Sequence, residues 1–273
     1  MTQRAAGREP LFIENNDYLR MLGLLKELTT RASITMYAFC LMPNHVHLLF
    51  SPQKANLYDA MRDLFSGYAR YFNRKYERKG HLFGGPYRQS VCLDEKYLLA
   101  ASVYIHLNPV RANLVSTPIQ YRWSSCRLYS EMKDLRSFVD SAFILGLLAD
   151  NIQTARRTYK TMLNQGLGLE IDEVLEEEKA IRHLLDKLIS ALPAIWERII
   201  PGRLKKSSGE ELLDAEALNR KMEELRQKGT MDRAESLRAK KFVIEQLIAR
   251  GYRRNEIADL MGLSIKTIYN FMK

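Results

Sequence analysis

The chain has 273 residues, is 46% hydrophobic and carries a formal net charge of +10, with a pI of about 9.4. This length allows one large domain or two smaller ones, and no apolar run reaches the ~18 residues that a membrane span requires. The N-terminus lacks the apolar core of a signal peptide, and three widely spaced cysteines form neither a disulfide framework nor a CxxC zinc pattern, so we expect a reducing, cytoplasmic location.

The first predicted elements are a helix and a β-hairpin. Residues 15–32 place leucines at helical spacing. β-branched and aromatic residues predict a strand over 33–41, and the Met-Pro-Asn sequence at 42–44 predicts a turn. Residues 45–51 then form the returning strand.

Two helices and a further strand are predicted next. A long helix spans 56–80, and a strand follows over 87–93. Residues 94–109 open with the capping residue Asp94 and run helically until Pro109 ends the helix. The order helix, strand, strand, helix, strand, helix predicts an α+β fold around an antiparallel sheet.

The charge distribution suggests three parts. Residues 1–130 hold 17 Lys and Arg against 9 Asp and Glu, and residues 220–273 hold 13 against 7. Between them, 131–219 is a mostly helical, acidic connecting region with 12 against 16, which contains an apparent linker at 201–211. Basic blocks attract polyanions such as nucleic acid, although solubilising lysines would give the same balance.

The last block, 233–273, is predicted to form three short helices. Its stretch RRNEIADLMGLSIKTIYNFM is typical of a helix-turn-helix, in which Ala258 permits close helix crossing, Gly262 makes the turn and Ser264 caps the second helix. A small protein-interaction bundle is the alternative. Ile265 and Ile268 would anchor the second helix. The residues expected to face a DNA groove are Lys266, Thr267, Tyr269 and Asn270.

The stretch MPNHVHLLF places two histidines on one strand. Because side chains alternate along a strand, His45 and His47 share a face and Val46 points the other way. Two imidazoles about 7 Å apart can converge on one metal ion. An HxH pattern also occurs by chance, in which case both histidines are partly exposed on a sheet face.

The predicted helix 94–109 carries two residues that change this assessment. Tyr104 and Asn108 stand four apart and share a helical face. Histidines and an amide oxygen can hold a divalent ion that polarises a phosphate, and a phenol can attack phosphorus. Taken singly, Tyr104 would be read as a core aromatic and Asn108 as a turn residue before proline.

Two longer stretches carry a resemblance to a known family. AFCLMPNHVHLLF and YLLAASVYIHLNPVRANLV resemble the two signature blocks of the HUH single-tyrosine transposases, and YRWSSCRLY resembles a further block of the REP-associated branch. The resemblance covers roughly residues 1–130, and its motifs match in order and spacing.

The resemblance implies a ferredoxin-like antiparallel sheet with helices, followed here by an all-α C-terminal region. It implies that Tyr104 is the nucleophile and that His45, His47 and Asn108 bind Mg²⁺ or Mn²⁺; His106 ranks lower because it lies near the opposite side of the helix. Zinc also suits two histidines, but amide and phosphate oxygens favour a harder ion.

The implied reaction is cleavage and rejoining of single-stranded or hairpin DNA through a 5′-phosphotyrosine link, without a nucleotide cofactor. The C-terminal helix-turn-helix would bind duplex DNA. The wider family works as homodimers, while the REP-associated branch is expected to act as monomers. An inactive DNA-binding regulator is the main alternative, and an RNA-binding ferredoxin-like module is another.

Further residues are expected to contact DNA phosphates. Cations and aromatic rings interleave in YARYFNRKYERKG, where we expect the rings to be buried and the cations to reach solvent. The candidates are Arg74, Lys75, Arg78, Lys79, Arg88 and Arg111.

The family also has a strand that precedes the TQRAAGREPLF segment. Because only the part after that strand is recognisable here, we expect the first strand to be missing and the histidine strand to lack a partner on that side.

Overall fold

A computed structural model of the chain describes most of its residues. The described ranges are 1–7, 9–54, 57–92, 94–131, 137–169, 177–199, 215–227, 233–249 and 254–271. The chain divides into two compact units, the first formed by Met1–Gln89 with Asp94–Ser208 and the second by Ser90–Leu93 with Gly209–Lys273. The predicted linker at 201–211 and much of the acidic cluster EIDEVLEEEKA lie outside the described residues.

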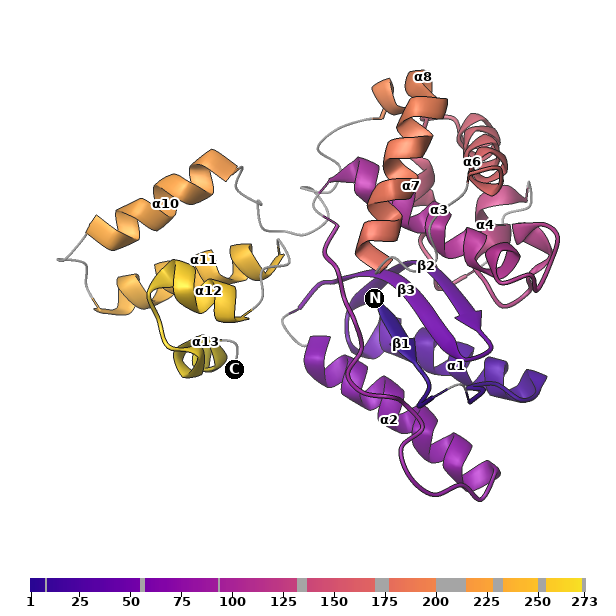
Figure 1. The fold of residues 1–273 in the computed structure, drawn as a ribbon, viewed down its shortest axis with the longest axis horizontal. Coiled ribbons are helices and arrows are strands. Elements are labelled where there is room, and N and C mark those ends of the chain that lie inside the picture. The colour runs from indigo at the N-terminus through magenta and orange to yellow at the C-terminus, as the bar shows by residue number, and fades with distance from the viewer. Residues whose placement is uncertain are drawn as a thin grey trace. The chain divides into compact units, whose positions relative to one another are not determined.

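The first unit contains an antiparallel sheet covered on both faces by helices (Figure 1). Helices α1 and α2 pack together on one face, and α3 packs on β2 and β3 from the other. The predicted α+β class and antiparallel sheet are confirmed. The elements that build this layer are β1 (Thr2–Arg4), α1 (Asn15–Arg31), β2 (Ile34–Met42), β3 (His45–Pro52), α2 (Leu57–Lys75) and α3 (Glu95–Arg111).

The three strands lie in the order β1-β3-β2, so the histidine strand is central. The predicted hairpin is confirmed: β2 pairs with β3 along its length, including Cys40 with His47. The prediction of a missing first strand was wrong. The short strand β1 pairs Thr2 with His47 and Arg4 with His45, which gives β3 a partner on that side.

Two other boundaries differ from the predictions. Of the predicted strand at 87–93, only Arg88 pairs among its described residues, in an isolated bridge to Thr2. Pro109 does not end its helix, because α3 continues to Arg111. A proline in the last turn removes one backbone donor without breaking the turns before it. The predicted cap Asp94 is confirmed, since its side chain accepts a hydrogen bond from the Tyr97 N–H at 2.7 Å.

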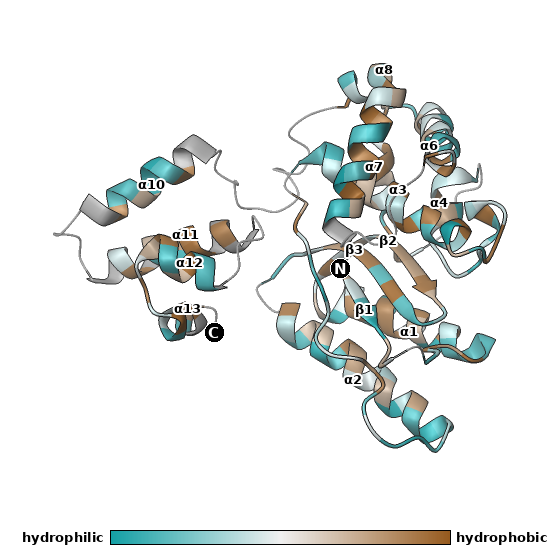
Figure 2. Cartoon of the chain, viewed as in Figure 1, coloured by the Kyte–Doolittle hydropathy of each residue, from teal (hydrophilic) through white to brown (hydrophobic). Residues whose placement is uncertain are grey.

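The core of the first unit lies between the sheet and its helices. Figure 2 shows hydrophobic residues along much of β2, and Met36, Cys40 and Leu41 of that strand are fully buried. Helix α3 is buried on nearly all sides because further helices pack on it. These following elements are η1 (Pro118–Gln120), α4 (Cys126–Ser130), α5 (Ser141–Leu145), α6 (Ile152–Leu167), α7 (Glu177–Ala191) and α8 (Pro193–Glu197).

The second unit is helical where it is described. Its core is a cluster that includes Val243, Ile257 and Ile268. The three helices predicted in 233–273 are present, preceded by a fourth. They are α10 (Ala215–Gln227), α11 (Arg233–Ala249), α12 (Arg254–Met261) and α13 (Ile265–Phe271). Within the described part of the chain, no helix is long and apolar enough to cross a membrane.

Candidate active site

Strand β3 presents the two histidines side by side. Their ring centroids are 4.7 Å apart and the rings are nearly perpendicular, at 86°. His47 is buried and His45 half-buried, while Val46 between them is buried on the opposite face. The strand alternation therefore places two imidazoles on one face of the sheet, as the spacing predicts.

Each imidazole is held through its Nδ1 atom. Nδ1 of His45 lies 2.7 Å from Oδ1 of Asn44, and Nδ1 of His47 lies 2.9 Å from Oγ1 of Thr2. An amide oxygen only accepts hydrogen bonds, so His45 donates from Nδ1 and its Nε2 carries the lone pair. The Thr2 hydroxyl likewise accepts a hydrogen bond from Nδ1 of His47 when His47 carries its proton on Nδ1. This is the usual support for histidines that bind a metal through Nε2.

Tyr104 lies on α3 beside this pair. Its ring centroid is 6.1 Å from that of His47, and the two rings are perpendicular. Tyr104 is half-buried, in contrast to its fully buried neighbours Val103 and Ile105. The structure therefore brings the predicted histidines and tyrosine together, from two elements far apart in sequence.

The guanidinium carbon of Arg111 lies 5.6 Å from the centre of the Tyr104 ring. A cation at this distance interacts favourably with the aromatic face and with any negative charge that develops on the phenol. Arg111 was predicted as a phosphate contact, and the structure places it beside the predicted nucleophile.

Asn108 follows Tyr104 by one helical turn. Its Nδ2 donates to the Tyr104 carbonyl at 2.8 Å, which ties the amide nitrogen to the helix. The amide oxygen, which is the atom that binds metals, is the opposite end of the same group. The side chain is half-buried.

His106 lies away from the histidine pair, in the core. Its Nδ1 is 2.8 Å from the Tyr159 hydroxyl and its Nε2 is 2.8 Å from the Ser125 hydroxyl. Burial lowers the pKa of His106 to about 3, so the ring is neutral at ordinary pH. Because both nitrogens already bond to protein groups, we leave His106 out of the candidate ligand set.

The donor set fits a divalent metal ion. Among the residues that the structure describes, no group of three or more His, Cys, Asp or Glu side chains is placed to hold a metal. The predicted set is the two imidazoles with the Asn108 amide oxygen, and a phosphate oxygen would complete it. Imidazole and oxygen donors together suit Mg²⁺, Mn²⁺ or similar ions.

The predicted phosphate contacts on and after α2 behave differently from one another. Arg74, Lys79 and Arg88 are exposed. Lys75 instead binds Glu14 and Asp17, with Nζ 2.6 Å from Oδ1 of the buried Asp17. Arg78 pairs with Glu9 and donates to the His81 carbonyl. Lys75 and Arg78 thus have structural partners. The predicted burial of Tyr68 and Phe72 is confirmed, whereas Tyr71, also predicted to be buried, is half-buried.

In the second unit, α12 and α13 are joined by a short turn. Gly262 has a φ of +62°, a conformation that favours glycine, and the Ser264 hydroxyl accepts from the Thr267 N–H at 3.1 Å. Ile268 is fully buried as predicted, but Ile265 is 50% exposed, so its predicted anchoring role was wrong. Lys266 and Asn270 are exposed and Thr267 is half-buried, while the side chain of Tyr269 lies outside the description.

Sequence reasoning missed two supporting residues of the site. Asn44 sits in the turn directly before His45, so its proximity to the ring could have been inferred from the hairpin. Thr2 reaches His47 only through the pairing of β1 with β3, for which a three-residue strand offers no periodicity.

Fold and site together define an α+β domain with paired histidines on its central strand and a tyrosine on the helix above them. A comparison with protein families gives the assignment: residues 4–108 match the family described as "Transposase IS200 like". This part of the chain is therefore similar to the IS200-like transposases, a family whose general activity is DNA cleavage and rejoining and whose general partner is DNA. Neither the curated proteins nor the solved structures contain a match to the chain.

Proposed function

We propose that the first unit cleaves and rejoins single-stranded DNA at a hairpin, as a REP-associated transposase does, with Tyr104 as nucleophile and a divalent metal as cofactor. The observation that carries this proposal is the contact of the Tyr104 ring with His47, the buried member of the histidine pair. The fold supports it as a compact version of the ferredoxin-like sheet.

In the proposed reaction, the phenolic oxygen of Tyr104 attacks a backbone phosphorus and forms a P–O bond. The bond from phosphorus to the 3′ oxygen breaks, and that oxygen leaves as a hydroxyl with the proton that the phenol gives up. The product is a 5′-phosphotyrosine link, and a second 3′-hydroxyl reverses the step to join strands. Arg111 favours the negative charge on the attacking oxygen.

His45, His47 and Asn108 would hold the metal ion. When bound, it withdraws electron density from a phosphate oxygen and so makes phosphorus easier to attack. Thr2 and Asn44 orient the two imidazoles through their Nδ1 atoms. The chain therefore supplies both the ligands and the groups that fix their orientation.

We also infer that α12 and α13 act as a helix-turn-helix that binds duplex DNA. The turn at Gly262, the cap at Ser264 and the exposed Lys266 and Asn270 support this role. Its contribution would be to localise the enzyme on double-stranded DNA beside the hairpin.

The test is the formation of a covalent adduct between the protein and a labelled hairpin oligonucleotide in Mn²⁺. We expect the wild type to form the adduct, Tyr104→Phe to form none, and the control Tyr76→Phe to form it normally. Chelation of the metal should also abolish it. A protein that binds the hairpin equally well with either residue at 104 and never forms the adduct is instead a DNA-binding regulator.

A further inference from the structure

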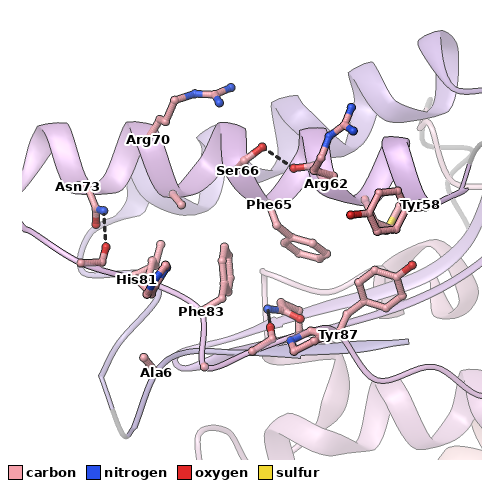
Figure 3. A pocket seen from close by; sticks show the side chains of 18 of the residues that line it. Ala6, Tyr58, Arg62, Phe65, Ser66, Arg70, Asn73, His81, Phe83 and Tyr87 are labelled. Carbon is pink, nitrogen blue, oxygen red and sulfur yellow. Dashed lines mark hydrogen bonds between the residues drawn. The ribbon is translucent and has the colours of Figure 1, made fainter.

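A groove separate from the histidine pair runs between α2 and residues 80–87 (Figure 3). Its volume is about 1140 Å³, which is large enough for more than one nucleotide base. One wall is α2, the other is the segment GHLFGGPY, and Gln3 of β1 also lines the groove.

The second wall is joined by backbone hydrogen bonds to β1 and to the residues directly after it. The Ala6 N–H donates to the Leu82 carbonyl at 2.9 Å, and the Gly84 N–H donates to the Arg4 carbonyl at 3.1 Å. A Cβ atom on Gly84 would lie 2.9 Å from the Ala5 carbonyl oxygen, so this close approach requires glycine. The groove is therefore a formed feature of the fold.

Aromatic side chains line both walls. Phe65 of α2 meets Phe83 edge to face, with centroids 5.2 Å apart, and lies 6.5 Å from Tyr87. Tyr58 stands 71% exposed at one end of the groove. Phe65 itself is buried, and the exposed Tyr58 and the half-buried Phe83 and Tyr87 offer stacking surfaces that any unpaired base can use regardless of sequence.

The charged side chains that line the groove are all positive. Arg62, Arg70 and Arg74 of α2 are exposed and line it, and none of the described residues lining it is acidic. The side chains of Arg62 and Arg70 extend from α2 toward solvent (Figure 3). Arg62 pairs with both Asp59 and Asp63, which leaves Arg70 and Arg74 as the stronger positive pair. Aromatic walls with a cationic rim suit a polyanion with exposed rings, which is single-stranded nucleic acid.

Gln3 supplies an independent indication of a ligand. Its side chain is only 4% exposed, and Nε2 donates to the Gly85 carbonyl at 3.0 Å. Gln3 lines the groove, and its Oε1 is buried and accepts no hydrogen bond from any residue the structure describes. A buried acceptor without a donor costs free energy unless a ligand supplies one, and a base edge presents such N–H groups.

The groove and the histidine pair lie on opposite faces of the sheet. Thr2 pairs with His47 and contacts its ring, whereas Gln3, the next residue, points to the other face, where α2 lies. The groove therefore does not hold the phosphate that Tyr104 would attack. A different part of the substrate, such as a hairpin loop or a flanking strand, would occupy it.

We propose that this groove binds an unpaired stretch of the DNA substrate, with bases stacked on the half-buried rings of Phe83 and Tyr87 and with Gln3 Oε1 accepting a hydrogen bond from one base. Arg70 and Arg74 neutralise the phosphates that pass the rim. The proposal rests on the proposed function in that DNA is the substrate, but it needs neither the metal nor Tyr104.

The test is fluorescence anisotropy of the full chain with a labelled oligothymidylate and with a duplex of the same length, both with EDTA. We expect Tyr87→Ala and Arg70→Glu each to weaken single-strand binding by roughly tenfold. Tyr87→Phe keeps the ring and should retain affinity. Arg157→Glu, a charge reversal at another exposed arginine, on α6, should change it less than about twofold. Circular dichroism confirms that each variant is folded.

The outcomes separate this proposal from the proposed function. If the wild type forms the covalent adduct but Tyr87→Ala and Arg70→Glu bind single strands as Arg157→Glu does, the groove proposal is overturned and the function stands. If no adduct forms but the groove variants lose single-strand affinity, the groove proposal stands and the function falls. Equal loss of duplex and single-strand affinity would also overturn the groove proposal.

Discussion

Asp17 is a buried carboxylate whose removal should destabilise the first unit. It accepts hydrogen bonds from the Ile13 and Glu14 N–H groups at 2.9 and 3.0 Å and from the Tyr76 hydroxyl at 2.7 Å, and it pairs with Lys75. Burial alone would raise the pKa of Asp17, but these hydrogen bonds outweigh it and lower the pKa from 3.8 to about 2. That shift corresponds to about 2 kcal/mol of stability at neutral pH, which Asp17→Asn should remove.

The sign of the pH dependence follows from the direction of the shift. Because the pKa of Asp17 is lower in the folded chain, its contribution is complete above the unfolded value of 3.8 and disappears as the pH falls through about 2. The difference between wild type and Asp17→Asn should therefore shrink to about half near pH 3.

Urea unfolding followed by tryptophan fluorescence measures this difference. Both tryptophans, Trp123 and Trp196, lie in the first unit, so the signal reports on that unit alone. Glu9→Gln, which breaks the exposed pair with Arg78, is the control and should cost less than about 1 kcal/mol. A loss for Asp17→Asn no larger than the control, or one that does not change between pH 7 and pH 3, would refute the reasoning.

Three further predictions concern the site, the core and the second unit. Thr2→Val removes the Nδ1 partner of His47 and should weaken Mn²⁺ binding roughly 10- to 100-fold in calorimetric titrations; unchanged affinity would exclude a supporting role for Thr2. His106→Leu should lose about 2 kcal/mol of stability at pH 7, because two buried hydroxyls are left with fewer partners. This loss should largely vanish near pH 5. At that pH His106 is protonated in the unfolded wild type but stays neutral in the folded protein, where its pKa is about 3, so the wild type itself becomes less stable. Ser264→Ala should lower protection of the α13 amides from hydrogen exchange by about 1 kcal/mol, and equal protection in both proteins would show that the cap is dispensable.

The predictable parts of the fold are those with a strong local signal. The hairpin of β2 and β3 has β-branched residues on both strands and a proline turn between them, so its position and the shared face of the histidines follow directly. The capping aspartate at 94 likewise marks the start of α3. In each case, neighbouring residues alone determine the element.

The errors arise where distant contacts decide the outcome. Among the described residues of the strand predicted at 87–93, only Arg88 forms a bridge to β1, and the segment before it lines the groove. Helix α3 continues past Pro109 because its surroundings hold it on nearly all sides. Strand β1 is too short for any periodicity, and only its pairing with β3 reveals it.

In the candidate site, too, some features follow from neighbouring residues and others depend on distant contacts. Spacing places the two histidines on one face, but nothing local places Tyr104 against them, and that expectation came from the resemblance of two separate motifs. The partners of the imidazole Nδ1 atoms and the position of Arg111 over the Tyr104 ring required the coordinates.

The enclosure of α3 bears on how strands would be exchanged. A Cβ atom on Gly166 of α6 would lie only 2.6 Å from the Leu107 side chain, Arg182 of α7 lies over the Tyr97 ring, and His106 links the helix to Ser125 and Tyr159. A helix anchored this firmly keeps its tyrosine over the histidines of its own chain. In the proposed reaction, Tyr104 therefore stays in place and the cut DNA ends move to it. The nucleophile and the histidines then come from the same chain, without a tyrosine from a second subunit.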